Sequence, residues 1–131
     1  QYFVHAEECG DWGYESLHHA IEERAIEEMK HAEKLISRIL FLEGTPVVDK
    51  LNKMHIAGTI NGMLENDHKA EVEAIANYNA AIKLSADLLD HGTKELLNSI
   101  LKDEEAHLDF IEEQIDQIKQ MGLEQYLTTV K

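Results

Sequence analysis

Glutamate and histidine occur three residues apart at four places in the chain. These pairs are Glu15/His18, Glu28/His31, Glu65/His68 and Glu104/His107. Carboxylate and imidazole groups are both good ligands for iron and similar metals, and this spacing brings them to one side of a helix. The spacing alone does not tell which pairs bind a metal, so the position of each pair on its helix has to decide.

The helices that would carry these pairs are predicted from the spacing of apolar residues. Helical spacing runs through almost the whole chain, and the only proline is Pro46. We expect helices at residues 1 to 11, 15 to 43, 60 to 90 and 93 to 120, and a short one at 123 to 128. The predicted fold class is all-α.

The connections predict how the helices follow one another. Residues 44 to 58 are long enough to run the length of a helix, so that the next helix starts parallel to the last. Residues 90 to 94 can only join antiparallel neighbours. This pattern is typical of a ferritin-like four-helix bundle with one long crossover, here with a short fifth C-terminal helix. We expect a single domain over residues 1 to 131, with the start of its first helix lying before Gln1.

Two of the four pairs fall within apolar stripes. Glu28 and His31 lie in the stripe of Leu17, Ile21, Leu35, Ile39 and Leu42, beside Ala32. Glu104 and His107 lie in the stripe of Leu97, Ile100, Leu108, Ile111, Ile115 and Ile118. A carboxylate buried there costs several kcal/mol unless it is paired or bound to a metal. Both pairs are therefore candidate metal ligands, although one such pair alone could equally be a buried hydrogen-bonded pair.

The helix between them adds a third glutamate. Glu71 lies at the centre of the arc formed by Ile60, Leu64, Ile75, Tyr78 and Ile82. Glu65 points about 120° away from Glu71, and His68 lies at the margin of the arc. Glu15 and His18 lie roughly 100° or more from the centre of the stripe on their own helix. We therefore interpret Glu65/His68 as no part of a site, and Glu15/His18 as a solvated or interfacial pair.

The remaining set predicts a site for two metal ions. It consists of Glu28, His31, Glu71, Glu104 and His107. Two neighbouring ions need bridging carboxylates to offset their charge, and each needs an imidazole. A symmetric site would need one more glutamate, which we expect before Gln1. Tyr78 and Tyr2 could hydrogen-bond a ligand or serve only as core aromatics.

A second apolar stripe on the helix at 15 to 43 predicts another contact. It consists of Ile26, Met29, Ile36 and Leu40. A helix with two apolar faces contacts something besides its own bundle, most simply another subunit. Glu23 and Glu27 lie on a flank between the faces, where we expect solvated side chains that could hold transient cations.

The composition of the chain excludes some classes of function and of cellular location. The net charge of −14 argues against nucleic acid as a partner and is compatible with cations. No apolar run reaches the ~20 residues of a membrane span and no signal peptide opens the chain, so we expect a cytoplasmic protein. The lone Cys9 allows no disulfide within the chain, and we expect it to be a small, partly buried residue.

Several stretches carry a resemblance to a known family. The segments "QYFVHAEECGDWGY", "EEMKHAEKLISRILFLEGTP", "ENDHKAEVEAI" and "DEEAHLDFIEEQIDQIKQMGLEQYL" resemble the bacterioferritin family, in order and over essentially the whole chain. The resemblance implies a hollow shell of 24 subunits that oxidises Fe(II) with dioxygen or peroxide at an intrasubunit di-iron site and stores the ferric product as mineral.

The resemblance also implies residue roles and partners. The five predicted metal ligands match the ferroxidase ligands, with Glu28 and Glu104 as the bridging carboxylates. Met29 matches the methionine that ligates haem b, or a related porphyrin, shared between two subunits. Where family members carry inward-facing iron-binding groups, this chain has Glu23 and Arg24. A ferredoxin-type reductant for iron release is a further implied partner.

Two other functions stay open on the residues alone. A rubrerythrin-like di-iron peroxidase or oxygenase would use the same ligand types without storing iron. A metal-free bundle could serve only as an assembly or binding subunit, and we keep this alternative because no residue from Gln1 onwards supplies the sixth ligand.

Overall fold

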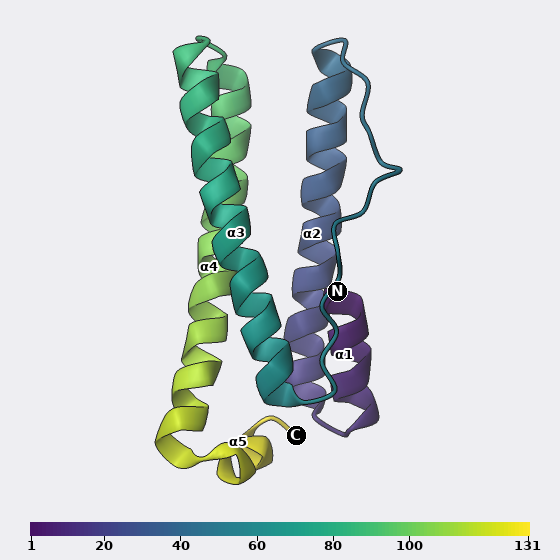
Figure 1. Cartoon of the computed structure of the whole chain (residues 1–131), viewed down its shortest axis with the longest axis vertical. Coiled ribbons are helices and arrows are strands. Elements are labelled where there is room, and N and C mark those ends of the chain that lie inside the picture. Colours follow the sequence, from purple (N-terminus) through teal and green to yellow (C-terminus); the bar gives the residue numbers. More distant parts are fainter. The chain divides into compact units, whose positions relative to one another are not determined.

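The computed structural model describes all 131 residues and contains five helices. They are α1 (Tyr2–Asp11), α2 (Glu15–Phe41), α3 (Ile60–Asp87), α4 (His91–Met121) and α5 (Leu123–Thr129), shown in Figure 1. The predicted all-α class and all five predicted helices are confirmed. No helix is long and apolar enough to cross a membrane. The chain divides into two compact units, Gln1–Ile56 with Val130–Lys131, and Ala57–Thr129, which are described separately.

In the first unit, α1 runs antiparallel to the first part of α2 (Figure 1). Leu17 and Ile21 of the predicted stripe are buried, but Ile39 and Leu42 at its other end are exposed. The predicted core position of these two residues is therefore wrong in this structure.

The beginning of α2 receives its acceptors from the other end of the chain. Its N-cap, Tyr14, makes no side-chain capping bond. Instead the backbone N–H of Ser16 donates to the carbonyl oxygen of Val130 (3.1 Å), and the Ser16 hydroxyl donates to that of Lys131 (3.0 Å). These bonds satisfy a donor that a helix start leaves open.

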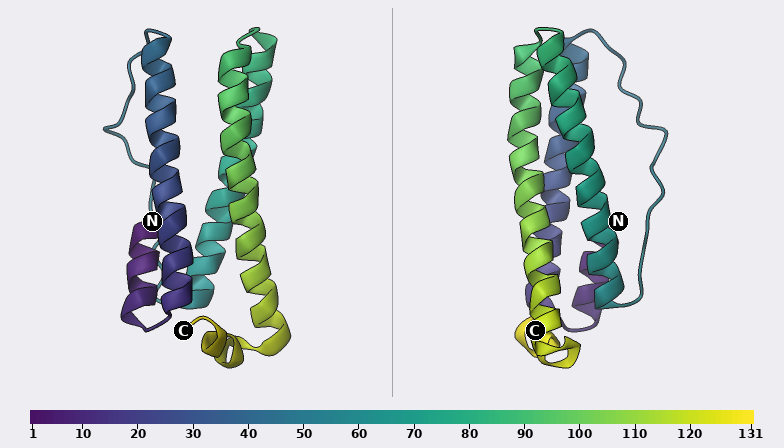
Figure 2. Two further views of the ribbon diagram at one scale, coloured as in Figure 1. Left: turned by 180° about the vertical axis from the view of Figure 1, so that it is seen from behind. Right: turned by 60° about the vertical axis from the view of Figure 1, so that its left-hand side comes forward.

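The long connection after α2 returns towards α1. The backbone N–H of His55 donates to Gln1 Oε1 at 3.0 Å, and the Gln1 amino group lies 3.8 Å from Met54 Sδ. Figure 2 shows this connection as a long loop without helical turns. The predicted long excursion of residues 44 to 58 is thus present as irregular structure.

In the second unit, α3 and α4 form an antiparallel pair (Figure 2). Helix α3 ends at Asp87 and not at residue 90, because Leu89 has a positive φ of 57°. Asp90 then caps the next helix, since its side chain accepts a hydrogen bond from the Thr93 N–H at 3.1 Å. The buried apolar side chains of the pair are Ile60, Met63, Leu64, Leu97, Ile100 and Ile111.

Helix α5 turns back from the end of α4. Gly122 takes a φ of 82°, which favours glycine, and separates the two helices. The fully buried Tyr126 donates its hydroxyl hydrogen bond to Gln114 Oε1 at 2.9 Å. This buried bond fixes the short helix against α4.

Candidate metal centre

Three of the five predicted ligands come together in the second unit. Glu71 of α3 and Glu104 and His107 of α4 offer ligand atoms that lie within 4.8 Å of one another. Glu71 and Glu104 are each only 1% exposed. His107 Nδ1 lies 3.9 Å from Glu71 Oε1. The three-residue spacing on α4 and the central position of Glu71 on the apolar arc of α3 bring these three side chains together.

The electrostatics of this cluster favour a cation. Two charged carboxylates within 4.8 Å of each other repel by at least about 3.5 kcal/mol at an effective dielectric constant of about 20. A divalent ion between them turns this repulsion into attraction. Carboxylate oxygens with an imidazole nitrogen form a donor set that suits iron, manganese or zinc. The buried residues of this unit therefore fit a transition-metal ion.

The other predicted pair lies on α2 in the first unit. His31 is buried, and its Nδ1 lies 3.8 Å from Glu28 Oε2, while the Glu28 side chain is partly exposed. The prediction that His31 points away from solvent agrees with its burial, whereas a shared role with Glu71, Glu104 and His107 stays a prediction.

The two rejected pairs lie outside the buried cluster. His68 Nε2 pairs with Glu112 Oε1 across α3 and α4 at 3.1 Å, with both side chains open to solvent, and Glu65 is exposed. His18 instead contacts α1, because its Nδ1 lies 2.7 Å from the carbonyl oxygen of Ala6. The interfacial interpretation of His18 is thus confirmed, whereas Glu15 is solvated.

Some buried polar residues escaped the sequence prediction. Asp67 is 1% exposed and precedes Glu71 by four residues, so that both fall on one face of α3. This spacing was the signal that could have identified it. In the first unit, the buried Arg24 guanidinium lies 3.9 Å above the Tyr2 ring, a cation–π contact. Tyr2, proposed as a possible ligand contact, therefore supports Arg24.

The second apolar stripe of α2 is open to solvent in this chain. Ile26, Met29 and Leu40 are all exposed, Met29 by 54%, and Ile36 is half-buried. Glu23 and Glu27 are exposed, as predicted for a solvated flank. Tyr78 is half-buried. Cys9 is fully buried, more deeply than expected.

Comparison with known proteins identifies the family. The family model for the ferritin-like domain matches residues 1–121. The chain is 40% identical to a bacterioferritin of Brucella melitensis over 96% of its own length and 78% of that protein. It is 38% identical to a bacterial ferritin of Synechocystis (97% and 82%) and 39% identical to a bacterioferritin of Rhodobacter capsulatus (93% and 76%). The predicted ferritin-like fold class is thereby confirmed, and the chain belongs to the bacterioferritin family.

Proposed function

We propose that this protein stores iron by oxidising Fe(II) and depositing the ferric product inside a protein shell. The observation that carries this proposal is the buried cluster of Glu71, Glu104 and His107, whose two carboxylates and imidazole form a donor set that suits a metal ion. The names of the bacterioferritin relatives support iron as that cation. Iron is here the substrate as well as the stored product.

Each of the five predicted ligands has a role in this proposal. Glu71, Glu104 and His107 bind Fe(II) from one unit of the chain, and Glu28 and His31 bind it from the other. Glu28 and Glu104 act as bridging carboxylates that hold two ions close together, while the imidazoles supply neutral nitrogen ligands. Each pair of Fe(II) ions gives up two electrons, which pass to dioxygen or peroxide. In this proposal residues 1 to 131 act as one domain.

The exposed apolar face of α2 gives the proposal a place for subunit contact. Ile26, Met29 and Leu40 expose apolar surface that a second copy of the chain would cover. We propose that two copies meet there in a 24-subunit shell, with a haem between the two Met29 thioethers. A thioether on an exposed apolar face fits an axial haem ligand. When bound, the haem would supply an electron-transfer centre for a ferredoxin-type reductant.

Fe(II) oxidation by the purified protein tests the central proposal. We expect rapid formation of the ferric absorption in the wild type and its loss in the double variant Glu28→Ala, Glu104→Ala. The matched control is Glu65→Ala, which removes an exposed glutamate from α3. A double variant that keeps the fast phase of Fe(II) oxidation would contradict the proposal.

Further measurements separate the other functions. Size-exclusion chromatography is expected to show a particle of about 24 subunits by the family resemblance, whereas a dimer would favour a rubrerythrin-like enzyme. Metal analysis that finds no iron after loading would favour a metal-free assembly subunit. For the haem, a Soret band that survives unchanged in Met29→Leu would show that Met29 is not the ligand.

A further inference from the structure

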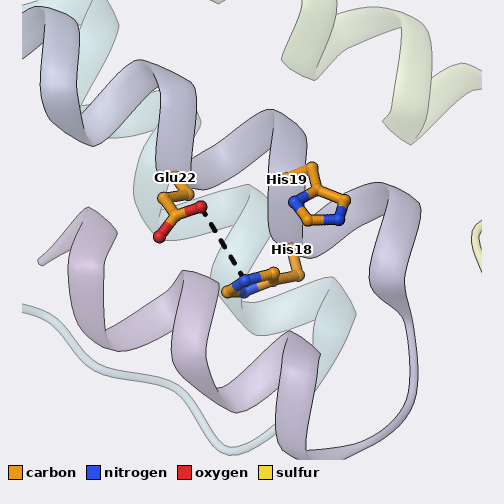
Figure 3. Close-up of side chains that lie close together, drawn as sticks. All are labelled: His18, His19 and Glu22. Atoms are coloured by element: carbon orange, nitrogen blue, oxygen red, sulfur yellow. Dashed lines mark ion pairs between the residues drawn. The ribbon is translucent and has the colours of Figure 1, made fainter.

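A second group of metal-ligand side chains lies at the surface of the first unit. His18, His19 and Glu22, all on α2, offer ligand atoms within 4.8 Å of one another (Figure 3). His18 is largely covered, with its side chain 16% exposed, whereas His19 is 67% exposed. The ring centroids of the two histidines are 5.2 Å apart. None of these residues belongs to the proposed iron site.

The His18 ring is held in the orientation that a metal ligand needs. Its Nδ1 lies 2.7 Å from the Ala6 carbonyl oxygen, which can only accept a hydrogen bond, so Nδ1 carries the proton. In the neutral ring, Nε2 then presents its lone pair, and this atom lies 3.9 Å from Glu22 Oε2. A histidine that binds a metal through one nitrogen commonly donates its other N–H to a backbone carbonyl in this way.

Helix α1 is shaped to accept this ring. A Cβ atom placed at Gly10 would lie 3.2 Å from His18 Nδ1 and 3.4 Å from its Cγ. The glycine therefore leaves room for the imidazole to reach the Ala6 carbonyl. The orientation of His18 is thus set by the packing of α1 against α2.

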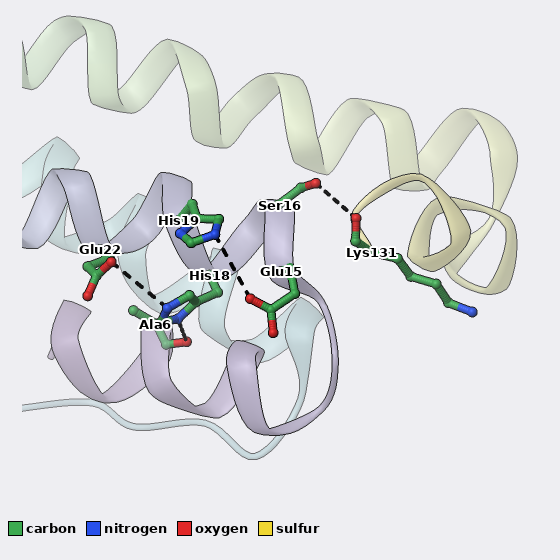
Figure 4. A network of polar contacts seen from close by, with 7 residues as sticks. All are labelled: Ala6, Glu15, Ser16, His18, His19, Glu22 and Lys131. Carbon is green, nitrogen blue, oxygen red and sulfur yellow. Dashed lines mark hydrogen bonds and ion pairs between the residues drawn. The ribbon is translucent and has the colours of Figure 1, made fainter.

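The surroundings of the three ligands are acidic. Figure 4 shows Glu15, whose Oε2 lies 4.0 Å from His19 Nε2, on the side of His19 away from Glu22. The hydrogen bond to the Ala6 carbonyl raises the pKa of His18 most strongly. Burial of the ring lowers this pKa, and the nearby carboxylates of Glu22, Glu7 and Glu15 raise it. The negative potential that favours a proton here also favours a divalent cation, which competes with that proton for the imidazole.

We propose that His18 Nε2, a ring nitrogen of His19 and the Glu22 carboxylate bind one divalent transition-metal ion of the zinc type. Two imidazoles and one carboxylate form a donor set that zinc uses in open sites, with water completing the coordination. Ligand atoms on one tetrahedral zinc lie about 3.3 Å apart, given bonds of about 2.0–2.1 Å. The exposed His19 and Glu22 side chains can approach His18 by the small rotation that this requires.

Zinc binding to the full-length protein tests this proposal. Crystals soaked in zinc are expected to show an anomalous diffraction peak between His18, His19 and Glu22. Calorimetry is expected to show one zinc per chain fewer in His19→Ala, or an affinity at that site at least about tenfold weaker. His19 is chosen because its exposed side chain leaves the fold unaffected. The matched control is His68→Ala, which removes a partly exposed histidine from the Glu112 pair and should leave the zinc count unchanged.

The outcomes distinguish this site from the proposed iron centre. His19→Ala should oxidise Fe(II) as fast as the wild type, because it leaves Glu71, Glu104 and His107 intact. The proposal is overturned if no anomalous peak lies between the three residues, if His19→Ala binds zinc as the wild type does, or if zinc binds there only at millimolar concentration.

Discussion

The buried cluster of Glu71, Glu104 and His107 predicts opposite effects of one substitution with and without metal. Glu71→Gln keeps the size of the side chain and removes one of two carboxylate charges that lie within 4.8 Å. At that distance or closer, the repulsion between the two charges is at least about 3.5 kcal/mol at an effective dielectric constant of about 20. Other polar contacts of these residues offset part of it, so we expect the metal-free variant to be more stable by about 1–3 kcal/mol.

Metal should reverse this order. A ligand present at 100 times its dissociation constant adds about 2.7 kcal/mol to the stability of a protein that binds it only when folded. Zinc is the suitable probe because it has no redox chemistry. We expect zinc to stabilise the wild type by about this amount at the buried cluster, and Glu71→Gln to lose most of that gain. The surface site at His18 contributes equally to both proteins.

Thermal unfolding with and without zinc measures both effects. A gain of 1–3 kcal/mol corresponds to a rise in Tm of about 3–10 °C for a chain of this size. Glu65→Gln is the control, because it makes the same change at an exposed position of α3 and should leave both melting temperatures unchanged. If metal-free Glu71→Gln melts below the wild type and zinc still raises its Tm as much, the reasoning about the buried charges is refuted.

Three further predictions concern other contacts. Gly10→Ala should raise the free energy of unfolding by about 1 kcal/mol, the helix propensity of alanine over glycine, only when His18 is also replaced by alanine. In the wild type the new Cβ would lie 3.2 Å from the His18 ring, and denaturant unfolding that shows equal gains in both backgrounds would contradict this. An NMR titration should give His18 a pKa above its ordinary 6.5, and this pKa should fall in Glu22→Gln; a lowered pKa in the wild type would contradict this. The contribution of His18 to stability should therefore be full below pH 6.5 and be lost as the pH rises through the raised pKa. Tyr126→Phe should cost about 1–2 kcal/mol by removing the buried bond to Gln114, and an unchanged denaturation midpoint would contradict it.

The residues show why part of this arrangement was predictable. Helical periodicity located all five helices, and the helical wheel identified Glu71 as the inward glutamate of α3, because burial repeats with the same period as the backbone. The same argument correctly excluded Glu65. Each of these inferences depends on a single helix, whose geometry is known in advance.

The predictions from sequence failed where the burial of a residue depends on a second helix. Ile39 has the spacing of a core residue but is exposed, because burial depends on what packs against that part of α2, and the spacing within one helix does not contain this information. His18 lies off the main stripe of α2, and only the approach of α1 at Gly10 turns it from a surface residue into one with a fixed ring orientation. A wheel drawn for one helix does not contain the length or the crossing of its partner.

The bonds from Ser16 to Val130 and Lys131 bear on the order in which the chain folds. Ser16 and Lys131 are 115 residues apart. As the chain emerges from the ribosome, α1 and α2 can pair early through local contacts, but the first turn of α2 must rely on water for these acceptors until residues 130 and 131 have been made. Closing so long a loop is entropically costly, so this contact forms after the helices that it joins. The first turn of α2 therefore gains these two hydrogen bonds only after the rest of the helix has formed.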